Sequence, residues 1–174
     1  YSEAYNNLGS ALQLNTDFKA AKRAYCKVLE MQPQFAAAHK NLGLLSLLMG
    51  DFQNGWREYE WRWQCDDFAS ERHRFHQPFW DGSSLNQKTI LIWTEQGVGD
   101  EIMFSSMLPT LLQIDVRVIV ECTLRLIPLF QRAFPGVQFI PRENPVNRQL
   151  LDMAIDCQIP MLSLGKWFRP SAER

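Results

Sequence analysis

The chain has 174 residues, of which 46% are hydrophobic and 21% are charged, and its formal net charge is −1. These proportions exclude a disordered tail or a low-complexity polymer, and the length suits one domain or two small ones. The near-neutral charge gives no basic face for nucleic acid, so nucleic-acid binding is not expected. The longest nearly apolar run, residues 42–49, is far shorter than the ~20 residues of a membrane span, so no membrane span is expected.

A repeat with a period of 34 residues opens the chain. Between residues 1–30 and 35–64, nine of thirty positions are identical, where chance would give about two. The identical pairs are Ala4/Ala38, Asn7/Asn41, Leu8/Leu42, Gly9/Gly43, Leu14/Leu48, Asp17/Asp51, Phe18/Phe52, Arg23/Arg57 and Tyr25/Tyr59. The pattern predicts two helical hairpins, with glycines where helices approach closely. Asn15-Thr16-Asp17 and Met49-Gly50-Asp51 are expected to supply the turn and N-cap residues between the helices.

The second copy departs from the first at its end. Arg62 and Trp63 stand where the first copy has aliphatic residues, and Asp67 stands where Pro33 would recur. A terminal repeat is expected to be atypical, because its outer face meets something other than another repeat. The aromatic residues that begin at Trp56 indicate either an interface or a ligand platform, and the large area that aromatic side chains bury favours the interface.

Stacked hairpins leave a concave face lined by the first helix of each pair. Polar side chains on these helices are therefore candidates for binding an extended peptide, with solvated helix positions as the alternative interpretation. The candidates are Asn6, Asn7, Gln13, Lys40 and Asn41.

Residues 68–88 show no periodicity and are interpreted as a linker, so the predicted division is 1–67, 68–88 and 89–174. His73 and His76 lie in this polar stretch without a third ligand and are expected to be solvated, and no metal site is predicted.

Strands alternate with helices after the linker. Strands are predicted at 89–93, 116–120, 137–140 and 154–157, with helices at 102–112, 124–134 and 147–152 and a kink at Pro109. Alternation favours a parallel sheet with the strand order 3-2-1-4, whose ligand crevice lies at the carboxyl ends of the first and fourth strands. The candidate crevice residues are Glu95, Gln96, Gly97, Gly99, Pro160 and Ser163.

The glycine loop after the first strand does not fit a dinucleotide site. Ile102 occupies the position of the third glycine, although Glu121 could serve as the ribose-binding acid. Asp100 and Glu101 place two carboxylates in the first helical turn, where a pyrophosphate needs positive potential. A carboxylate at the crevice suits proton abstraction, with helix capping as the alternative role for Asp100.

Four widely spaced cysteines, Cys26, Cys65, Cys122 and Cys157, contain no Cys-x-x-Cys pair. They are interpreted as small hydrophobic residues in a reducing compartment.

No signal peptide is visible, so a cytoplasmic location is expected. Tyr1 in first position indicates a piece of a longer protein.

Two family resemblances follow from these residues. The period, with Tyr5-x-x-Leu8-Gly9, Ala21-x-x-x-Tyr25 and Pro33, resembles the tetratricopeptide repeat. The remainder resembles the junction in bacterial tetratricopeptide proteins fused to a glycosyltransferase-like domain, and is similar to the amino-terminal half of heptosyltransferases (glycosyltransferase family 9). The residues that carry this second resemblance are Trp80-Asp81-Gly82, Leu85, residues 88–92, residues 95–100, Phe104, Leu108-Pro109, residues 134–137, Asp156 and residues 160–164.

The resemblance implies an α plus α/β chain, in which repeats precede a Rossmann-like half of a GT-B-type transferase. It implies that Asp100 is the catalytic base of an inverting sugar transfer and that the crevice residues form the acceptor cleft. The nucleotide-sugar donor would bind the carboxyl-terminal half, which the chain lacks, so no cofactor is expected here and this chain alone is expected to be inactive. Met103 and Phe104, which follow Glu101, depart from the heptosyltransferase pattern. The resemblance therefore does not imply which acceptor the chain uses.

A different class of function stays open beside the transferase. The chain could be a non-catalytic interaction scaffold whose repeats bind a protein or peptide and whose transferase-like half is structural. A second βαβ half downstream, with a phosphate-binding loop, would favour the enzyme.

Overall fold

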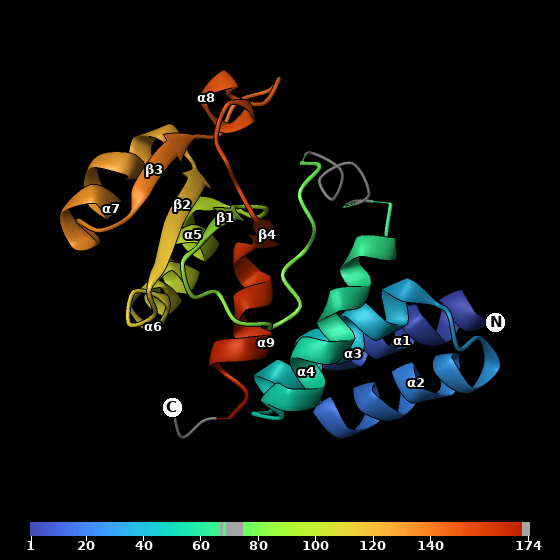
Figure 1. Cartoon of the computed structure of the whole chain (residues 1–174). Coiled ribbons are helices and arrows are strands. Elements are labelled where there is room, and N and C mark those ends of the chain that lie inside the picture. The colour runs from blue at the N-terminus through green and yellow to red at the C-terminus, as the bar shows by residue number, and fades with distance from the viewer. Residues whose placement is uncertain (67, 69–74, 172–174) are drawn as a thin grey trace. The chain divides into compact units, whose positions relative to one another are not determined.

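A computed structural model describes residues 1–66, 68 and 75–171 (Figure 1). Asp67 and His73, considered above, lie outside these described residues. The chain divides into two compact units: a helical unit, residues 1–72 with 169–174, and an α/β unit, residues 73–168. Arg169 thus groups with the helices, where its carbonyl accepts a hydrogen bond from the indole Nε1 of Trp56 at 2.8 Å.

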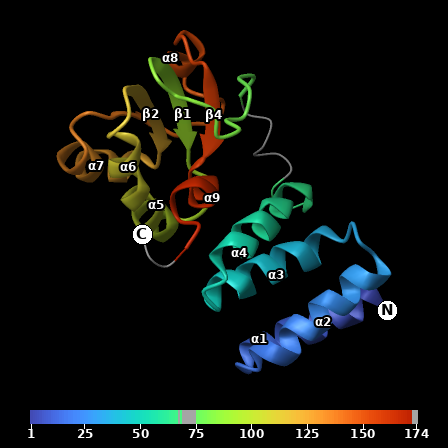
Figure 2. The ribbon, with the colours of Figure 1, turned by 60° about the horizontal axis from the view of Figure 1, so that its bottom comes forward.

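The helical unit contains the two expected hairpins (Figure 2). The first pairs α1 (Ser2–Leu14) with α2 (Phe18–Met31), and the second pairs α3 (Ala36–Leu48) with α4 (Phe52–Tyr59). Corresponding helices begin 34 residues apart, in agreement with the period of the sequence. The prediction of two helical hairpins is therefore confirmed.

The turns inside the hairpins repeat the same local chemistry. Asp17 accepts a hydrogen bond from the Ala20 amide at 3.0 Å, and Asp51 accepts one from the Asn54 amide at 3.4 Å. The residue before each cap has a left-handed backbone, with φ 62° at Thr16 and 82° at Gly50. The N-cap prediction is confirmed in both copies.

Two glycines let the helices of each hairpin approach. A Cβ atom on Gly9 would lie 2.5 Å from the Tyr25 ring, and one on Gly43 would lie 2.5 Å from the backbone nitrogen of Tyr59. Both distances are shorter than any van der Waals contact. A side chain at residue 9 would therefore displace the Tyr25 ring, and one at residue 43 would displace the backbone of α4.

The second hairpin ends in a tighter helix than the first. After Tyr59 the chain continues as the 3-10 helix η1 (Glu60–Gln64). The side chain of Arg62 is fully buried and donates from Nη1 to the Tyr59 carbonyl at 3.2 Å and to Glu60 at 2.7 Å. These two bonds hold the buried guanidinium against the 3-10 turn.

The predicted linker is largely part of the α/β unit. Phe75 and Leu85 are buried, with Leu85 in the main core. The Trp80 amide donates to the Gln158 carbonyl at 2.8 Å, and the Gln158 amide donates to the Pro78 carbonyl at 2.9 Å. Residues 75–88 therefore differ from the expected connector because they pair with and cover the edge of the sheet.

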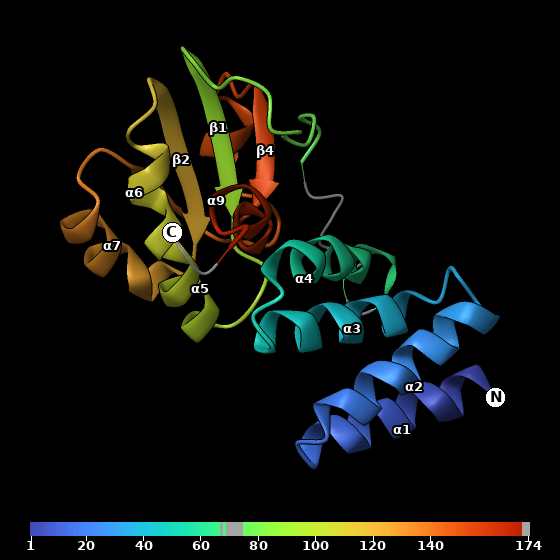
Figure 3. The ribbon, with the colours of Figure 1, turned by 90° about the horizontal axis from the view of Figure 1, so that it is seen from below.

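The α/β unit is built on a four-stranded parallel sheet with the order β3-β2-β1-β4, as predicted, and Figure 3 shows β2, β1 and β4 side by side. Ile90, Ile92, Val118 and Val120 form the core with residues of the helical segments that follow the strands. The strands are β1 (Lys88–Trp93), β2 (Val116–Cys122), β3 (Gln138–Pro141) and β4 (Cys157–Pro160). The α-helices are α5 (Val98–Phe104), α6 (Leu108–Leu111), α7 (Ile127–Ala133), α8 (Arg148–Leu151) and α9 (Gly165–Phe168), and the 3-10 helices are η2 (Ser105–Met107), η3 (Leu124–Leu126) and η4 (Met161–Leu164).

The last strand begins three residues later than predicted. Asp156, expected inside the strand, instead accepts a hydrogen bond from the Thr89 amide at 2.7 Å at the start of β1. Gln158 lies in β4 and is 1% exposed. Its side chain accepts from the Trp93 indole at 2.9 Å and donates to the Phe75 and Gln77 carbonyls at 3.1 and 2.7 Å.

Candidate functional site

The loop after β1 leads into the first turn of α5 at the carboxyl edge of the sheet. Gly97 is the N-cap of α5 and no side chain caps this helix. Asp100 is partly exposed, and within the described residues its carboxylate has no hydrogen-bond or ion-pair partner. The alternative role of Asp100 as the helix cap is therefore not observed, and its carboxylate is available to a ligand.

Glu101, the next residue, has a different role. Its side chain is 2% exposed and accepts hydrogen bonds from the Thr123 amide at 3.0 Å and the Thr123 hydroxyl at 2.5 Å. These bonds join α5 to the end of β2. The expectation that Asp100 and Glu101 both present charge to a docked diphosphate is thus corrected, because the Glu101 carboxylate is directed into the protein.

Further polar groups are buried at the same edge. Glu95 and Glu121 are 8% and 0% exposed, and Arg142 donates from Nη1 to the Thr94 carbonyl at 2.7 Å. The Thr94 hydroxyl is buried and has no hydrogen-bond partner in the part of the chain that the structure describes, which costs about 1–3 kcal/mol. Because Glu121 has no exposed surface, it cannot act as a ribose-binding acid in this arrangement.

The predicted crevice residues divide by exposure. Gly97 and Gly99 are exposed and Gln96 is half-buried, so these positions line the approach to Asp100. Glu95 and Ser163 are buried, and so is Pro160, the last residue of β4. Their role in an acceptor cleft stays a prediction, and the structure places them beneath the surface.

The Cys122 thiol lies fully buried at the end of β2. Burial, together with the nearby charges of Glu101 and Glu121, raises its pKa to about 12. All four cysteines are free thiols. The high pKa makes Cys122 a poor nucleophile, in agreement with a role as a small buried hydrophobic residue.

The repeat face brings some of its candidates together. The Asn41 amide donates to the Asn6 side chain at 3.1 Å, which joins α3 to α1. Asn7 is exposed, and the Lys40 ammonium lies 5.6 Å from the centre of the Phe68 ring.

The Gln13 candidate is turned toward α2. Its side-chain oxygen accepts a hydrogen bond from the Tyr25 hydroxyl at 3.1 Å. Gln13 therefore contributes to packing within the first hairpin, and its role toward a partner stays a prediction.

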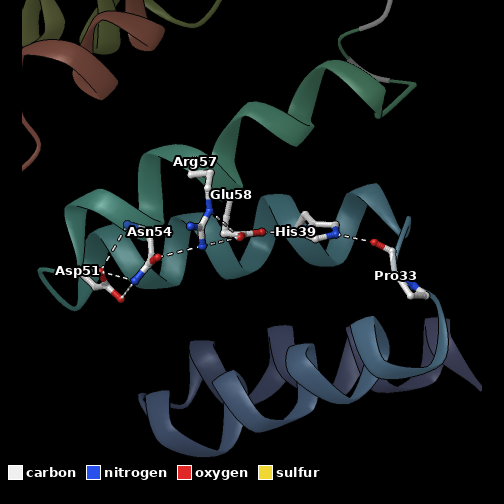
Figure 4. Close-up of polar contacts among 6 residues, drawn as sticks. All are labelled: Pro33, His39, Asp51, Asn54, Arg57 and Glu58. Atoms are coloured by element: carbon white, nitrogen blue, oxygen red, sulfur yellow. Dashed lines mark hydrogen bonds and ion pairs between the residues drawn. The ribbon is translucent and has the colours of Figure 1, made fainter.

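A chain of polar contacts fixes the second hairpin (Figure 4). The Arg57 guanidinium donates to Asn54 at 2.9 Å and to the Glu58 carboxylate at 3.3 Å. The other Glu58 oxygen lies 2.5 Å from Nδ1 of His39, whose Nε2 lies 2.8 Å from the Pro33 carbonyl. These contacts join α4 to α3 and to the connection between the hairpins. Asn41 lies on α3, the helix that they fix.

Sequence reasoning missed Thr123 and Arg142 at the carboxyl edge and misjudged the orientation of Glu101. Glu101, Thr123 and Arg142 orient the loop and strand ends there. A signal was present for two of them, because Thr123 and Arg142 directly follow strands whose carboxyl ends meet at one edge. Nothing in the sequence distinguished the buried Glu101 from the exposed Asp100 beside it.

Neither a metal-binding cluster nor a membrane-spanning helix occurs in the described residues. Across residues 1–66, 68 and 75–171, no three His, Cys, Asp or Glu side chains are grouped so that they could hold a metal ion. None of the helices in these ranges has the length and hydropathy to cross a membrane.

Comparison with known proteins gives one partial similarity. The chain is 34% identical over 152 residues to Protein FlbA of Caulobacter vibrioides. The match covers 79% of this chain and 24% of FlbA, so the chain spans about a quarter of that relative's length. No family model matches the chain.

Proposed function

We propose that the chain is the repeat region and acceptor half of a glycosyltransferase that transfers a sugar from a nucleotide donor to an acceptor hydroxyl. The observation that carries the proposal is the Asp100 carboxylate at the carboxyl edge of a parallel sheet, which is partly exposed and has no partner among the described residues. Ligands of such sheets bind at this edge, beside the strands where the order reverses.

In the proposed reaction Asp100 accepts the proton of the acceptor hydroxyl. The oxygen then attacks the anomeric carbon of the donor sugar while the nucleoside diphosphate leaves from the opposite face. The configuration at the anomeric carbon is therefore inverted. A positioned base of this kind contributes about 10²–10⁴-fold to a rate. The bonds between Glu101 and Thr123 support this role, because they fix the helical turn that carries Asp100.

The helical hairpins are proposed to be tetratricopeptide repeats that bind an extended protein or peptide. The contact between Asn6 and Asn41 supports a face shared by α1 and α3. Replacing Asn7 and Asn41 together with Ala should weaken recovery of the partner in pull-downs from the source cell. Unchanged recovery would contradict this part of the proposal.

A structural observation also favours the non-catalytic scaffold. Glu95, Pro160 and Ser163 are buried at the place where an open acceptor cleft would need accessible side chains. If the transferase-like half is structural, the intact protein will show no turnover with any nucleotide sugar. The enzyme and scaffold proposals therefore differ in a direct assay.

The transferase proposal is tested in the intact protein with a panel of nucleotide sugars. Asp100→Asn should reduce transfer by about 100-fold or more, because a base is lost, while the donor dissociation constant stays unchanged. Asp115→Asn is the matched control, since Asp115 is exposed directly before β2, at the amino edge. Full activity of Asp100→Asn, or loss of donor binding, would contradict the assignment.

A further inference from the structure

An open hollow of about 330 Å³ lies at the amino edge of the sheet in the α/β unit. Leu85 and Ile114, which precede β1 and β2 in the chain, are among the residues around it, so it lies at the opposite edge from Asp100. Its volume is within the range of pockets that hold small ligands. This aromatic hollow is lined by Trp80, residues 82–84, Leu85, Ile114, Trp167 and Phe168.

Three aromatic rings form the walls of the hollow. The ring centre of Trp80 lies 5.4 Å from that of Trp167 and 5.9 Å from that of Phe168. All three residues pack against the main core and remain only partly buried. Gly82, with a φ of 92°, lies against Trp167, where a Cβ atom would overlap the ring. The turn and the end of α9 are thus held together, and a ligand would meet walls that are already formed.

The turn before β1 supplies polar groups at the rim. Asp81 Oδ1 accepts a hydrogen bond from the Ser83 amide at 2.9 Å. This bond, and then one from the Ser83 side chain, hold the pKa of the Asp81 carboxyl below its ordinary value, so the group is ionised at neutral pH. Ser84 is exposed and its hydroxyl oxygen accepts from the Asn86 amide at 3.3 Å, which leaves its own O–H to donate.

The charges beside the hollow restrict the class of ligand. The Lys166 ammonium lies 4.8 Å from the centre of the Trp167 ring, so a cationic ligand on that ring would meet a like charge. The Asp81 carboxylate lies next to Trp80 in the chain and would repel an anion. Both signs of charge therefore flank the hollow, which favours an uncharged ligand.

We propose that the aromatic hollow is a binding site for an uncharged saccharide. A sugar ring has a face of C–H groups that packs on an indole ring, and its edge carries hydroxyls that bond to groups such as Asp81 and Ser84. A purely apolar ligand would give those rim groups no new partners. The proposal concerns a second site beyond the sugar transfer proposed at Asp100, and it does not depend on that transfer.

Titration of the complete chain with neutral oligosaccharides tests the proposal. Maltotriose, cellotriose and N,N′,N″-triacetylchitotriose are added at millimolar concentrations, and the indole N–H signals are followed by NMR. We expect at least one of them to shift the signals of Trp80, whose indole donates to the Ser83 carbonyl at 2.8 Å, and of Trp167. The signal of the buried Trp93 should stay in place. Choline and N-acetyl-leucine amide, as cationic and apolar probes, should leave all three signals unchanged.

Substitutions identify the walls and the rim. Trp167→Leu should weaken saccharide binding about tenfold or more, because a stacking ring is lost. Ser84→Ala should weaken it about 2- to 10-fold through the loss of one hydrogen bond, and its exposed position keeps the test valid if Trp167→Leu does not fold. Phe134→Leu is the matched control, because Phe134 packs against the same core outside the hollow. It should leave the affinity unchanged.

Three results would overturn the proposal. The first is that none of the three saccharides shifts the Trp80 or Trp167 signal. The second is that choline or N-acetyl-leucine amide shifts these signals more than any saccharide, which would make a cation or an apolar side chain the occupant. The third is that Phe134→Leu weakens saccharide binding as much as Trp167→Leu.

Discussion

Among the described residues, buried charged side chains are concentrated in the α/β unit, and Arg62 is the exception in the helical unit. In the helical unit, the contact between His39 and Glu58 joins side chains that are 13% and 16% exposed. In the α/β unit, Gln158, Glu101 and Glu121 are at most 2% exposed, and Glu101 lies at one edge of the sheet with the unpartnered Thr94 hydroxyl. A buried polar group costs free energy unless it is hydrogen-bonded. The contrast therefore distinguishes a repeated helical scaffold from a sheet edge that buries particular polar side chains.

The largest expected effect comes from the buried amide of Gln158. Gln158→Met removes the partner of Trp93 and of two carbonyls, so the free energy of unfolding should fall by about 3 kcal/mol or more. Gln138→Met is the control, because Gln138 only makes an exposed contact with Arg117 and should change stability by about 0.5 kcal/mol or less. Equal losses in urea denaturation would remove the contrast between buried and surface polar groups.

A second comparison lies within the helical unit. Gly43→Ala would bring a Cβ against the backbone of Tyr59, whereas Gly9→Ala meets only the ring of Tyr25. Gly43→Ala should therefore cost about 2–3 kcal/mol and Gly9→Ala about 1 kcal/mol. Thermal unfolding of both variants measures the difference, and a larger loss for Gly9→Ala would contradict the packing described for the hairpins.

The buried thiol gives the α/β unit a pH dependence. The pKa of Cys122 is about 12 in the folded chain, against ~8.5 for an exposed thiol. The unfolded chain therefore loses this proton first as the pH rises, so the contribution of Cys122 to stability is complete below pH ~8.5 and decreases toward pH 12 by at most about 1.4 kcal/mol per pH unit.

Replacement of the thiol tests this dependence. Cys122→Ala should make stability fall less steeply with alkaline pH in urea titrations. Cys26→Ala, at a partly exposed helix position, is the control and should follow the unmodified chain. An unchanged slope in Cys122→Ala would contradict the pKa shift.

The smallest effect is expected at the turn of the first hairpin. Thr16 has a φ of 62°, and the equivalent position in the second hairpin is a glycine. Thr16→Gly should stabilise the chain by about 0.5–1 kcal/mol, because glycine adopts this backbone without strain. The same change at Asn15, where φ is −84°, should give no gain, and a gain there would show that strain is not the cause.

Sequence patterns predicted much of the fold because they reflect local physics. The 34-residue period predicted both hairpins and their caps, and the alternation of strands and helices predicted the sheet order. The start of β4 and the extent of the linker were missed, because they depend on long-range contacts of Gln158 with residues 75–80. Sequence alone cannot indicate such contacts.

The candidate site was predicted less completely than the fold. The place of the partly exposed Asp100 and of the glycines beside it follows from the rule for parallel sheets. The opposite orientations of Asp100 and Glu101 depend on Thr123, which lies 22 residues from Glu101 in the sequence. The burial of Pro160 and Ser163 depends on how β4 and η4 pack, which no local pattern encodes.

The central claim is that the carboxyl edge at Asp100 belongs to the acceptor side and does not bind the donor diphosphate. The most direct test is a titration of this chain with nucleotide sugars, followed by amide chemical shifts and calorimetry. The account predicts no micromolar binding and no shift changes at residues 97–101. Micromolar binding with changes at these residues would show that the diphosphate binds here and that the acceptor assignment of this half is wrong.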